Sequence, residues 1–446
     1  MPSPTRSPRP ALRHLPLALM LAIAATGAQA AGFQLKENSA TGLGRAFAGS
    51  GAAPGDVAVI ANNPAAMSLL EGYVVQADLS LIDLSVESDL AGNDALGRPL
   101  TGGDGGDAGD LAPVPAAYFG APIGDRMRVG VSLTAPFGLK TEYDDDWVGR
   151  YHALTSDLRT IDLALALSYE VTDTFSLGGS VIYQYADAEL SNAVDFGAIL
   201  AAQGLAPTFL PQSADGRATI KGDDYAWGWT LGALWRVTDS FNLGFNYRSE
   251  IDHELSGTAD FDVPANAAAV FGQLPGNLFT GTGGRADLTT PAVATLSGYW
   301  QATDRWSLMA DVSRTYWDSF EDITVRYDNP AQPPTVDPQL WRNTWFASLG
   351  TDYRLNDRWT LRAGVAYDQT PTRLGHRTPR VPDTDRRWVS LGASFEPTNA
   401  WLLSAGYTHI FSNEPGIVLD SATGSTLEGS SKAKTNLFAV SAAYRF

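Results

Sequence analysis

The sequence contains no cysteine, and this absence excludes disulfides, thiol chemistry and thiolate metal sites. Its five histidines are scattered without the spacing of a metal site, so neither a metal nor a cofactor is expected. Beyond residue 30 there is no apolar run of about 18 residues, which excludes a helical membrane protein. Basic residues are also few, with 31 Lys and Arg against 49 Asp and Glu, and the net charge of −18 argues against nucleic acid as a partner.

Residues 1–30 are typical of a secretory signal and are set aside from the fold. They contain three arginines, then an apolar stretch at residues 15–25, then small residues at positions 28–30. Cleavage there would leave a mature chain that begins at Ala31. Because three Arg and no acidic residues would be removed, the net charge would change from −18 to −21.

A seven-residue cassette recurs along the rest of the chain. Each copy has two aromatic residues six positions apart and, between them, Thr or Asn followed by Asp or Asn, at residues 169–175, 235–241, 300–306, 353–359 and 395–401. The polar pair favours a tight turn because its side chains hydrogen-bond to their own backbone. A sixth copy, which lacks the second aromatic, occupies residues 119–127 around Gly124 and Asp125. The repeat therefore predicts six short turns.

The residues flanking each cassette alternate with a period of two, as in residues 161–169 and 175–183. Aromatics beside short turns, on the apolar face of alternating strands, are typical of the girdle of a membrane barrel. Six turns join twelve strands, and residues 73–86 and 435–446 add two more. We therefore predict an all-β fold, a fourteen-stranded antiparallel transmembrane β-barrel over residues 73–446. Both termini would lie on the short-turn side, in the periplasm, and seven long connections would be extracellular.

The chain ends on an aromatic residue, Phe446. It is either one more girdle residue or the terminal Phe that insertion machinery recognises in outer-membrane barrels, and the two interpretations are compatible. The expected partners are the barrel assembly machinery, outer-membrane lipid and lipopolysaccharide. A monomer is expected.

Residues 31–72 precede the first strand and are too irregular and Gly-rich to form a strand pair. A barrel of this size would leave a channel that some element can fill. A short segment tethered at the periplasmic mouth suits that purpose, so we predict that residues 31–72 form a small N-terminal hatch inside the lumen.

Six motifs distributed over the mature chain make it resemble the FadL family of outer-membrane long-chain fatty acid transporters, whose relatives also carry aromatic hydrocarbons. They lie at residues 32–35, 42–46, 63–65, 135–138, 142–151 and 378–386. The resemblance implies a hydrophobic groove in the extracellular loops, an inner pocket touched by the mature N-terminus, and a kink in the third strand. It also implies that Gly32 and Phe33 lie at the pocket. A gate turn of Asn63, Pro64 and Ala65 would reach toward the kink.

The third predicted strand alternates over residues 127–135 and then meets Pro136, Phe137 and Gly138. Pro cannot donate to a ladder and Gly weakens one, so pairing is expected to fail there. One interpretation is a bulge without functional consequence. In the family context we favour a lateral gap, through which an apolar solute leaves the lumen for the bilayer and avoids the aqueous periplasmic exit.

Two long loops are unexpectedly apolar, and their apolar residues are Phe196, Ile199, Leu200, Phe209, Val270, Phe271 and Leu274. Loop helices that pack on each other would explain them. Exposed apolar patches more often mark binding sites, and the resemblance implies that the groove capturing fatty acid lies in these loops.

By strand parity Arg128, Arg248 and Arg362 point into the lumen, where Arg pairs well with a substrate carboxylate. Solvated or salt-bridged arginines are the alternative. The Asp-rich segment at residues 102–110 has carboxylates that suit Ca²⁺, but a mobile loop is the better interpretation of a single, unrepeated copy.

The sequence thus predicts non-enzymatic uptake of long-chain fatty acids or similar hydrophobic molecules across the outer membrane. Cargo would be captured in the loop groove, transferred to the hatch pocket and released laterally at the kink. A channel for aromatic hydrocarbons or alkanes, with the same fold, and a general porin are the alternatives. A barrel enzyme is disfavoured because no Ser and His stand at matching strand positions.

Overall fold

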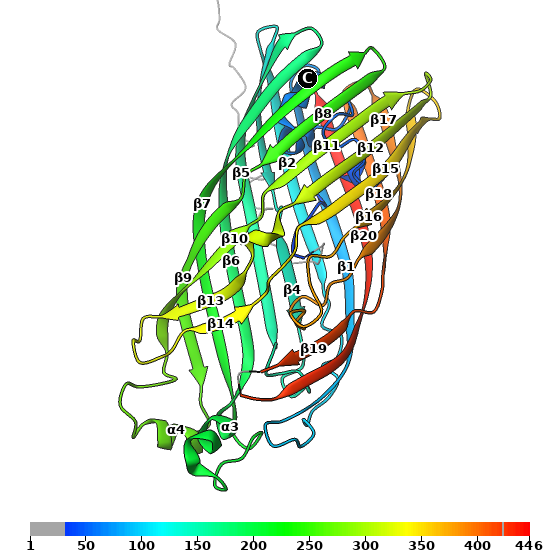
Figure 1. Cartoon of the computed structure of the whole chain (residues 1–446). Coiled ribbons are helices and arrows are strands. Elements are labelled where there is room, and N and C mark those ends of the chain that lie inside the picture. The colour runs from blue at the N-terminus through cyan, green and yellow to red at the C-terminus, as the bar shows by residue number, and fades with distance from the viewer. Residues whose placement is uncertain (1–31, 422) are drawn as a thin grey trace, which may run out of the picture.

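The computed structural model describes residues 32–421 and 423–446, so the predicted signal at residues 1–30 lies outside the described residues. The described chain forms one closed antiparallel barrel (Figure 1). Its strands are β1 (Val74–Asn93), β2 (Leu111–Ile123), β3 (Met127–Thr134), β4 (Gly138–Glu142), β5 (Thr155–Thr172), β6 (Phe175–Asp195), β7 (Asp215–Thr238), β8 (Phe241–Arg248), β9 (Ile251–Asp262), β10 (Thr282–Thr290), β11 (Val293–Gln301), β12 (Trp306–Thr315), β13 (Asp322–Tyr327), β14 (Thr335–Pro338), β15 (Thr344–Arg354), β16 (Trp359–Asp368), β17 (Arg386–Thr398), β18 (Trp401–Ser412), β19 (Gly416–Asp420) and β20 (Thr426–Arg445).

The barrel has fourteen strands, which confirms the prediction from the turns. Four pairs of consecutive segments each form a single barrel strand, and these pairs are β3 with β4, β8 with β9, β10 with β11, and β12 with β13. The segments β14 and β19 lie in long connections and are not barrel strands. β1 and β20 pair along their whole length and close the barrel. Both are longer than the predicted residues 73–86 and 435–446, because pairing continues into polar residues beyond the apolar band.

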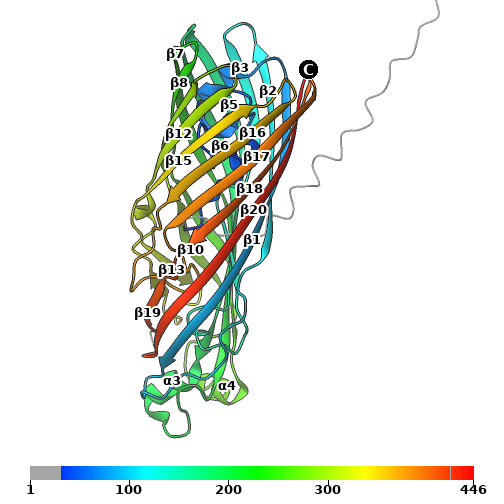
Figure 2. The same cartoon turned by 90° about the vertical axis from the view of Figure 1, so that its right-hand side faces the viewer.

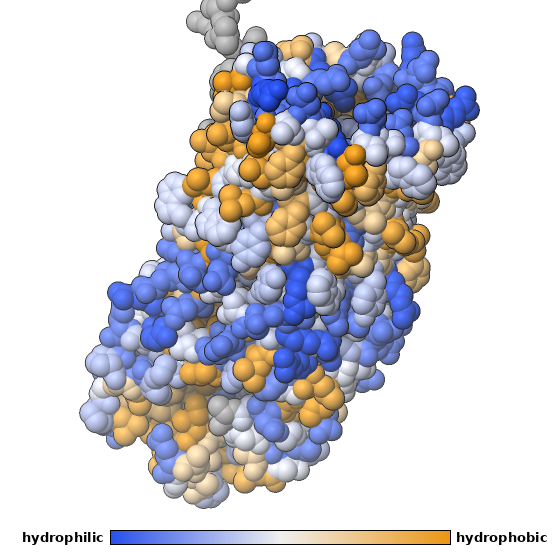
Figure 3. All heavy atoms as spheres, turned by 45° about the horizontal axis from the view of Figure 1, so that its top comes forward, coloured by the Kyte–Doolittle hydropathy of each residue, from blue (hydrophilic) through white to orange (hydrophobic). Residues whose placement is uncertain are grey.

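Six short turns lie at one end of the barrel, at the positions of the cassettes. The aromatic residues beside them are exposed on the outer face, as Trp235, Trp300 and Trp401 are. Figure 3 shows apolar side chains gathered in a band near this end, bounded by a hydrophilic rim. Period-two alternation therefore places the girdle on the outer face of the barrel.

The seven long connections lie at the opposite end, which we call the loop end. They carry three short helical segments, α3 (Phe196–Leu200), η2 (Ala201–Leu205) and α4 (Ala265–Phe271), whereas η3 (Trp317–Ser319) lies between β12 and β13. No helix in the described part of the chain is long and apolar enough to cross a membrane.

Residues 32–72 lie inside the barrel near the short-turn end, where Figures 1 and 2 show them in dark blue. We call this segment the hatch. Ser39 caps its first helix by accepting a hydrogen bond from the Gly42 N–H, and Asn63 caps its third by accepting one from Ala65. The three hatch helices are α1 (Ala40–Leu43), α2 (Val59–Asn62) and η1 (Pro64–Leu69). Buried strand residues such as Ala166, Leu234 and Ala443 pack against the hatch from the barrel wall.

Candidate functional site

The third strand of the barrel is interrupted between β3 and β4. β3 pairs with β5 as far as Thr134, and pairing resumes on β4 at Gly138. The three residues 135–137 stand opposite two residues of β5, which is the pattern of a bulge. Among the described residues β4 forms no ladder with β2. The sheet is therefore open between β2 and β4, at the position where the kink was predicted.

The first residues of the hatch bind to this kink. The N–H of Leu35 donates to the carbonyl of Pro136 at 2.7 Å, and the N–H of Gly138 donates to the carbonyl of Phe33 at 2.8 Å. Backbone groups that the broken ladder leaves without strand partners are satisfied by the hatch. The hatch thus serves as a short extra strand at the kink.

The two bonds flank an isolated antiparallel bridge between Gln34 and Phe137. Beside this bridge Phe33 is 2% exposed, and its ring centroid lies within 6.0 Å of those of Phe137, Trp317, Phe320 and Trp341. Three of these contacts are edge-on and the one with Trp341 is tilted, and such contacts add to the burial of a large apolar ring. The preceding N–H, that of Gly32, donates to the carboxylate of Asp383 at 3.0 Å. The hatch N-terminus is therefore held by ring packing and by a buried carboxylate.

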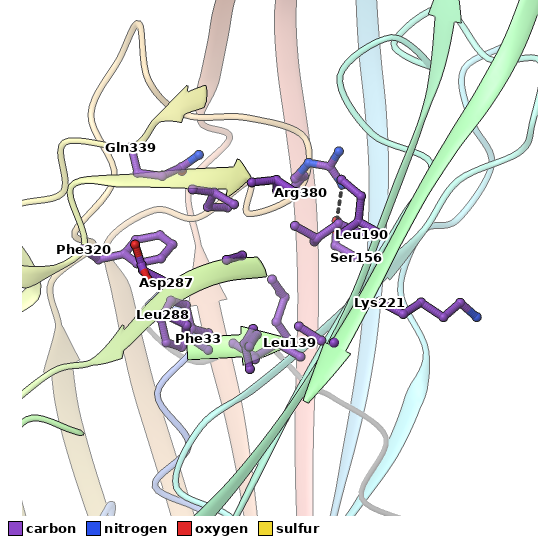
Figure 4. Close-up of a pocket in the computed structure, with 18 of the residues that line it drawn as sticks. Phe33, Leu139, Ser156, Leu190, Lys221, Asp287, Leu288, Phe320, Gln339 and Arg380 are labelled. Atoms are coloured by element: carbon purple, nitrogen blue, oxygen red, sulfur yellow. Dashed lines mark hydrogen bonds between the residues drawn. The ribbon is translucent and has the colours of Figure 1, made fainter. Parts of the chain in front are cut away.

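A pocket lies next to Phe33, inside the barrel (Figure 4). The space among its side chains is about 870 Å³ with its solvent-open part included, which is within the range of ligand pockets. We call it the apolar pocket, because most of its lining is apolar, namely Phe33, Leu139, Leu158, Ala188, Leu190, Ile220, Leu255, Leu288, Phe320, Ile323, Val325 and Val381.

A second space, the polar cavity, adjoins the opposite side of the Gln34–Phe137 bridge. Lys36, Arg248 and Asp311 are its charged lining residues, accompanied by Gln34, Asn38, Ser50, Asn62, Thr134, Asn246, Thr295 and Ser313. The Lys36 ammonium lies 4.3 Å from the centre of the Phe346 ring, and burial in the barrel lowers the pKa of this hatch residue. This cavity suits water and ions better than an acyl chain.

The three arginines predicted to contact a carboxylate lie away from the apolar pocket. Arg128 donates to the carbonyl of Gly72 at 3.1 Å, where the hatch joins β1. Arg362 is paired with Asp352 at 3.4 Å, and Arg248 borders the polar cavity. Strand parity placed their side chains inward, but it carries no information about depth along the lumen.

Two arginines that sequence reasoning missed border the apolar pocket, the exposed Arg285 and the buried Arg380. Arg380 belongs to the loop between β16 and β17, is 8% exposed, and donates to the hydroxyl of Ser156 at 3.0 Å. Burial lowers the pKa of its guanidinium. Its only signal in the sequence was its place in the motif at residues 378–386, because a loop has no periodicity to show that it folds inward.

The gate turn at residues 63–65 lies against β6 and β7, although the resemblance placed it toward the kink. The Asn63 side-chain amide donates to the carbonyl of Ala233 at 3.1 Å. A Cβ at Gly178 would lie 2.3 Å from the Ala65 nitrogen, and one at Gly232 would lie 2.0 Å from the Asn63 side-chain oxygen. These two glycines let the turn sit directly on the barrel wall, and the hatch residues that contact the kink are instead those near Phe33.

Six of the seven apolar loop residues pack against one another at the loop end. Phe196 on α3 and Phe271 on α4 are in edge-on contact, with ring centroids 5.6 Å apart. Leu274 remains 37% exposed. We call the six residues other than Leu274 the loop cluster; besides Phe196 and Phe271 they are Ile199, Leu200, Phe209 and Val270. None of the seven lines the apolar pocket, so this arrangement matches loop helices that pack on each other.

A family model described as outer membrane protein transport protein (OMPP1/FadL/TodX) matches residues 21–446. The long-chain fatty acid transport protein of Salmonella typhi is 31% identical over 391 residues, which cover 85% of this chain and 87% of that protein. Outer membrane protein P1 of Haemophilus influenzae is 31% identical over 421 residues, 88% of this chain and 89% of that protein.

Two solved structures also match this chain. A crystal structure of a Pseudomonas aeruginosa FadL homologue matches with a TM-score of 0.88 at 34% identity, covering 93% of this chain and all of that one. The Pseudomonas putida toluene transporter TodX matches with a TM-score of 0.69 at 20% identity over 94% of this chain and 100% of that one, which shows the shared fold alone. The chain therefore belongs to the OMPP1/FadL/TodX family of outer-membrane transport proteins, a family without catalytic activity.

Proposed function

We propose that this protein takes up long-chain fatty acids, or hydrophobic molecules similar to them, across the outer membrane. The observation that carries the proposal is the apolar pocket, because it ends on Phe33, a hatch residue that is itself hydrogen-bonded to the kink. Two relatives at 30% and 31% identity, both named long-chain fatty acid transport protein, support this choice of cargo.

The proposed route has three steps. Cargo is first captured at the loop end beside the loop cluster, where Leu205, the last residue of η2, and Leu274 offer exposed apolar surface. It then enters the apolar pocket and lies against Phe33. Finally the hatch N-terminus and the gate turn at residues 63–65 move, and the cargo leaves sideways between β2 and β4 into the bilayer. The broken ladder on that side supports the last step, since few backbone bonds need to open.

We also propose that the short-turn end faces the periplasm and the loop end faces outward. Short turns and long loops are distributed in this way in bacterial outer-membrane barrels. Phe446 lies at the short-turn end and is 71% exposed, which leaves it accessible to barrel assembly machinery. Outer-membrane lipid and lipopolysaccharide would surround a monomeric barrel.

Uptake is tested in Gram-negative cells that lack their own fatty acid transporter. Expression of the chain should restore uptake of radiolabelled oleate, and the purified protein should bind a fluorescent fatty acid. If it neither restores uptake nor binds acyl chains, the proposal is wrong.

The same cells distinguish the alternatives. Uptake of toluene or naphthalene without oleate would identify a hydrocarbon channel. A large and steady single-channel conductance would favour a general porin, because it requires a lumen that the hatch does not seal.

A further inference from the structure

Three arginines on one wall of the barrel lack an acidic partner. This wall consists of β12, β15, β16 and β17, which pair in that order and lie side by side in Figure 2. Arg314 lies on β12, Arg387 lies on β17, and Arg342 lies in the loop that leads into β15. The two strand arginines face outward, because Val312 and Val389, two positions away, are 44% and 46% exposed. Among the described residues none of the three arginines forms an ion pair, and we call them the arginine patch.

Other cations on the outer face near the loop end are neutralised. Five of them pair with acidic side chains at 2.5 to 3.7 Å, and the pairs are Lys140 with Asp110, Arg159 with Asp187, Lys221 with Glu189, Arg326 with Asp287, and Lys432 with Glu414. The acid beside the patch, Asp385, already accepts hydrogen bonds from the Tyr367 hydroxyl at 2.6 Å and the Thr370 N–H at 2.9 Å. The patch therefore keeps an excess of positive charge on a chain whose net charge is −18.

Aromatic side chains surround the patch. The Arg314 guanidinium lies 4.8 Å from the centre of the Trp345 ring, and a cation over an aromatic face is stabilised. The Tyr367 hydroxyl is close enough to Arg342 and Arg387 to interact with both charges. Because stacking uses the face of a guanidinium, the N–H groups on its edge stay available to an anion.

The patch lies one bilayer thickness away from the aromatic girdle at the short turns. Residues 306–314, 359–367 and 387–395 each run from a girdle aromatic to the level of the patch, and each contains nine residues. A tilted strand crosses the bilayer with about 9–11 residues. Trp345 and Tyr367, 48% and 43% exposed on the outer face, mark an aromatic belt at this level. The arginine patch therefore lies at the depth of the lipid headgroups on the loop-end side.

We propose that the arginine patch binds the phosphate groups of a phosphorylated glycolipid of the outer leaflet, the lipid A part of lipopolysaccharide. Arginine binds phosphate through two parallel N–H bonds, and basic residues at headgroup depth meet lipid phosphates. Three strand spacings of about 4.8 Å separate β12 from β17, so Arg314 and Arg387 stand roughly 14 Å apart. This spacing suits a headgroup with two separate phosphates. The inference rests on the proposed orientation of the barrel and is independent of the cargo.

The test measures lipid binding by native mass spectrometry of the purified full-length protein in detergent. The probes are diphosphorylated lipid A and the same lipid without its phosphates. Wild type should bind the diphosphorylated form roughly tenfold more tightly or better, since that form alone makes charge-assisted bonds. The triple variant Arg314→Gln, Arg342→Gln and Arg387→Gln should lose this preference, and the corresponding triple Lys variant should keep part of it. Arg326→Gln, at an exposed and paired position on the outer face, is the matched control and should behave like wild type.

A triple Gln variant that still prefers the diphosphorylated lipid would overturn the site. Equal weakening of both lipids would overturn it as well, because the patch would then contact something other than phosphate. Displacement of the lipid by an equal concentration of inorganic phosphate would show a site for free anions and contradict the glycolipid assignment.

If the triple Gln variant fails to fold, salt provides the second measurement on wild type. Raising NaCl from about 0.05 M to about 0.5 M should weaken binding of the diphosphorylated lipid more than that of the other form, and equal weakening would overturn the proposal. Oleate binding and uptake should be unchanged in every variant of the patch. Failure of the glycolipid site therefore leaves the proposed uptake intact, whereas a wild type without oleate binding or uptake refutes the uptake alone.

Discussion

The two spaces beside the Gln34–Phe137 bridge differ in chemistry although they are neighbours. The apolar pocket is walled by aliphatic and aromatic side chains, whereas the polar cavity presents Lys36, Arg248 and Asp311. An acyl chain gains about 0.8 kcal/mol for each CH₂ that it buries on the apolar side, and it would lose that gain in a hydrated cavity. A straight path through the polar cavity would therefore cost the cargo this gain, which supports the proposed exit between β2 and β4.

Removing the Phe33 ring, which lies between the apolar pocket and the polar cavity, should have the largest effect on fatty acid binding. Phe33→Ala leaves a void among four aromatic rings, and such truncations destabilise by about 3–5 kcal/mol. We expect the hatch N-terminus to detach and acyl-chain affinity to fall roughly a hundredfold. Hydrogen exchange of the hatch and fatty acid binding measure the two effects.

Phe438→Ala, on the lipid-facing surface and 47% exposed in the wild type, is the control and should change neither quantity. If Phe33→Ala behaved like this control, Phe33 would neither hold the hatch N-terminus nor contact the acyl chain.

The next largest effect is expected from weakening the hydrogen bond between the Gly32 N–H and Asp383. Asp383 is 3% exposed, accepts the Gly32 N–H and is paired with Arg386 at 2.6 Å. Asp383→Asn keeps an acceptor but removes the buried charge, so we expect a loss of about 3 kcal/mol and faster hydrogen exchange in the hatch. Asp385→Asn, in the same loop but not bonded to the hatch, should have less effect. Equal hydrogen exchange in the two variants would show that Asp383 does not hold the hatch N-terminus.

The apolar wall can be tested within one strand. Leu158 lines the apolar pocket and Leu163, also on β5, faces lipid and is 51% exposed. Leu158→Ser should weaken fatty acid binding by roughly tenfold, the equivalent of about 1.4 kcal/mol of lost apolar contact. Leu163→Ser should leave binding unchanged. The reverse order in a binding titration would contradict the location of the pocket.

The smallest expected effect is a pH dependence of hatch docking. Burial raises the pKa of Glu37 to about 7, so the docked hatch holds a proton that the released hatch gives up at lower pH. Docking is then strongest below the ordinary carboxyl pKa of 4.5 and weakens as the pH rises to about 7. Glu37→Gln should flatten this dependence. Thermal unfolding of both proteins at several pH values checks it, and parallel curves would exclude Glu37 as the source.

The barrel could be predicted from the sequence because the cassettes recur and the flanking strands alternate, which is local information. Pro136 and Gly138 marked the kink for the same reason. The extra length of β1 and β20 escaped prediction, since their outer ends are polar and carry no alternation.

The composition of the pocket could not be predicted, because tertiary contacts build it. Arg380 enters through a loop that folds inward, and no local pattern indicates that fold. Parity placed Arg128, Arg248 and Arg362 in the lumen but could not show that they lie at different depths. The apolar residues of α3 and α4 signalled a cluster, but not whether it faces a ligand or itself.

The central claim is that cargo leaves at the kink when the hatch N-terminus moves, and one cross-link tests it directly. The chain has no cysteine, so the double variant Gln34→Cys and Phe137→Cys carries a unique pair. The bonds that flank this bridge make it a non-hydrogen-bonded pair, whose Cα atoms lie about 4.5 Å apart, within reach of a disulfide. In oxidised cells oleate should still bind but uptake should fall to background, and a reductant should restore it, with each single variant unaffected by oxidation. Undiminished uptake in the fully cross-linked protein would contradict lateral release at the kink.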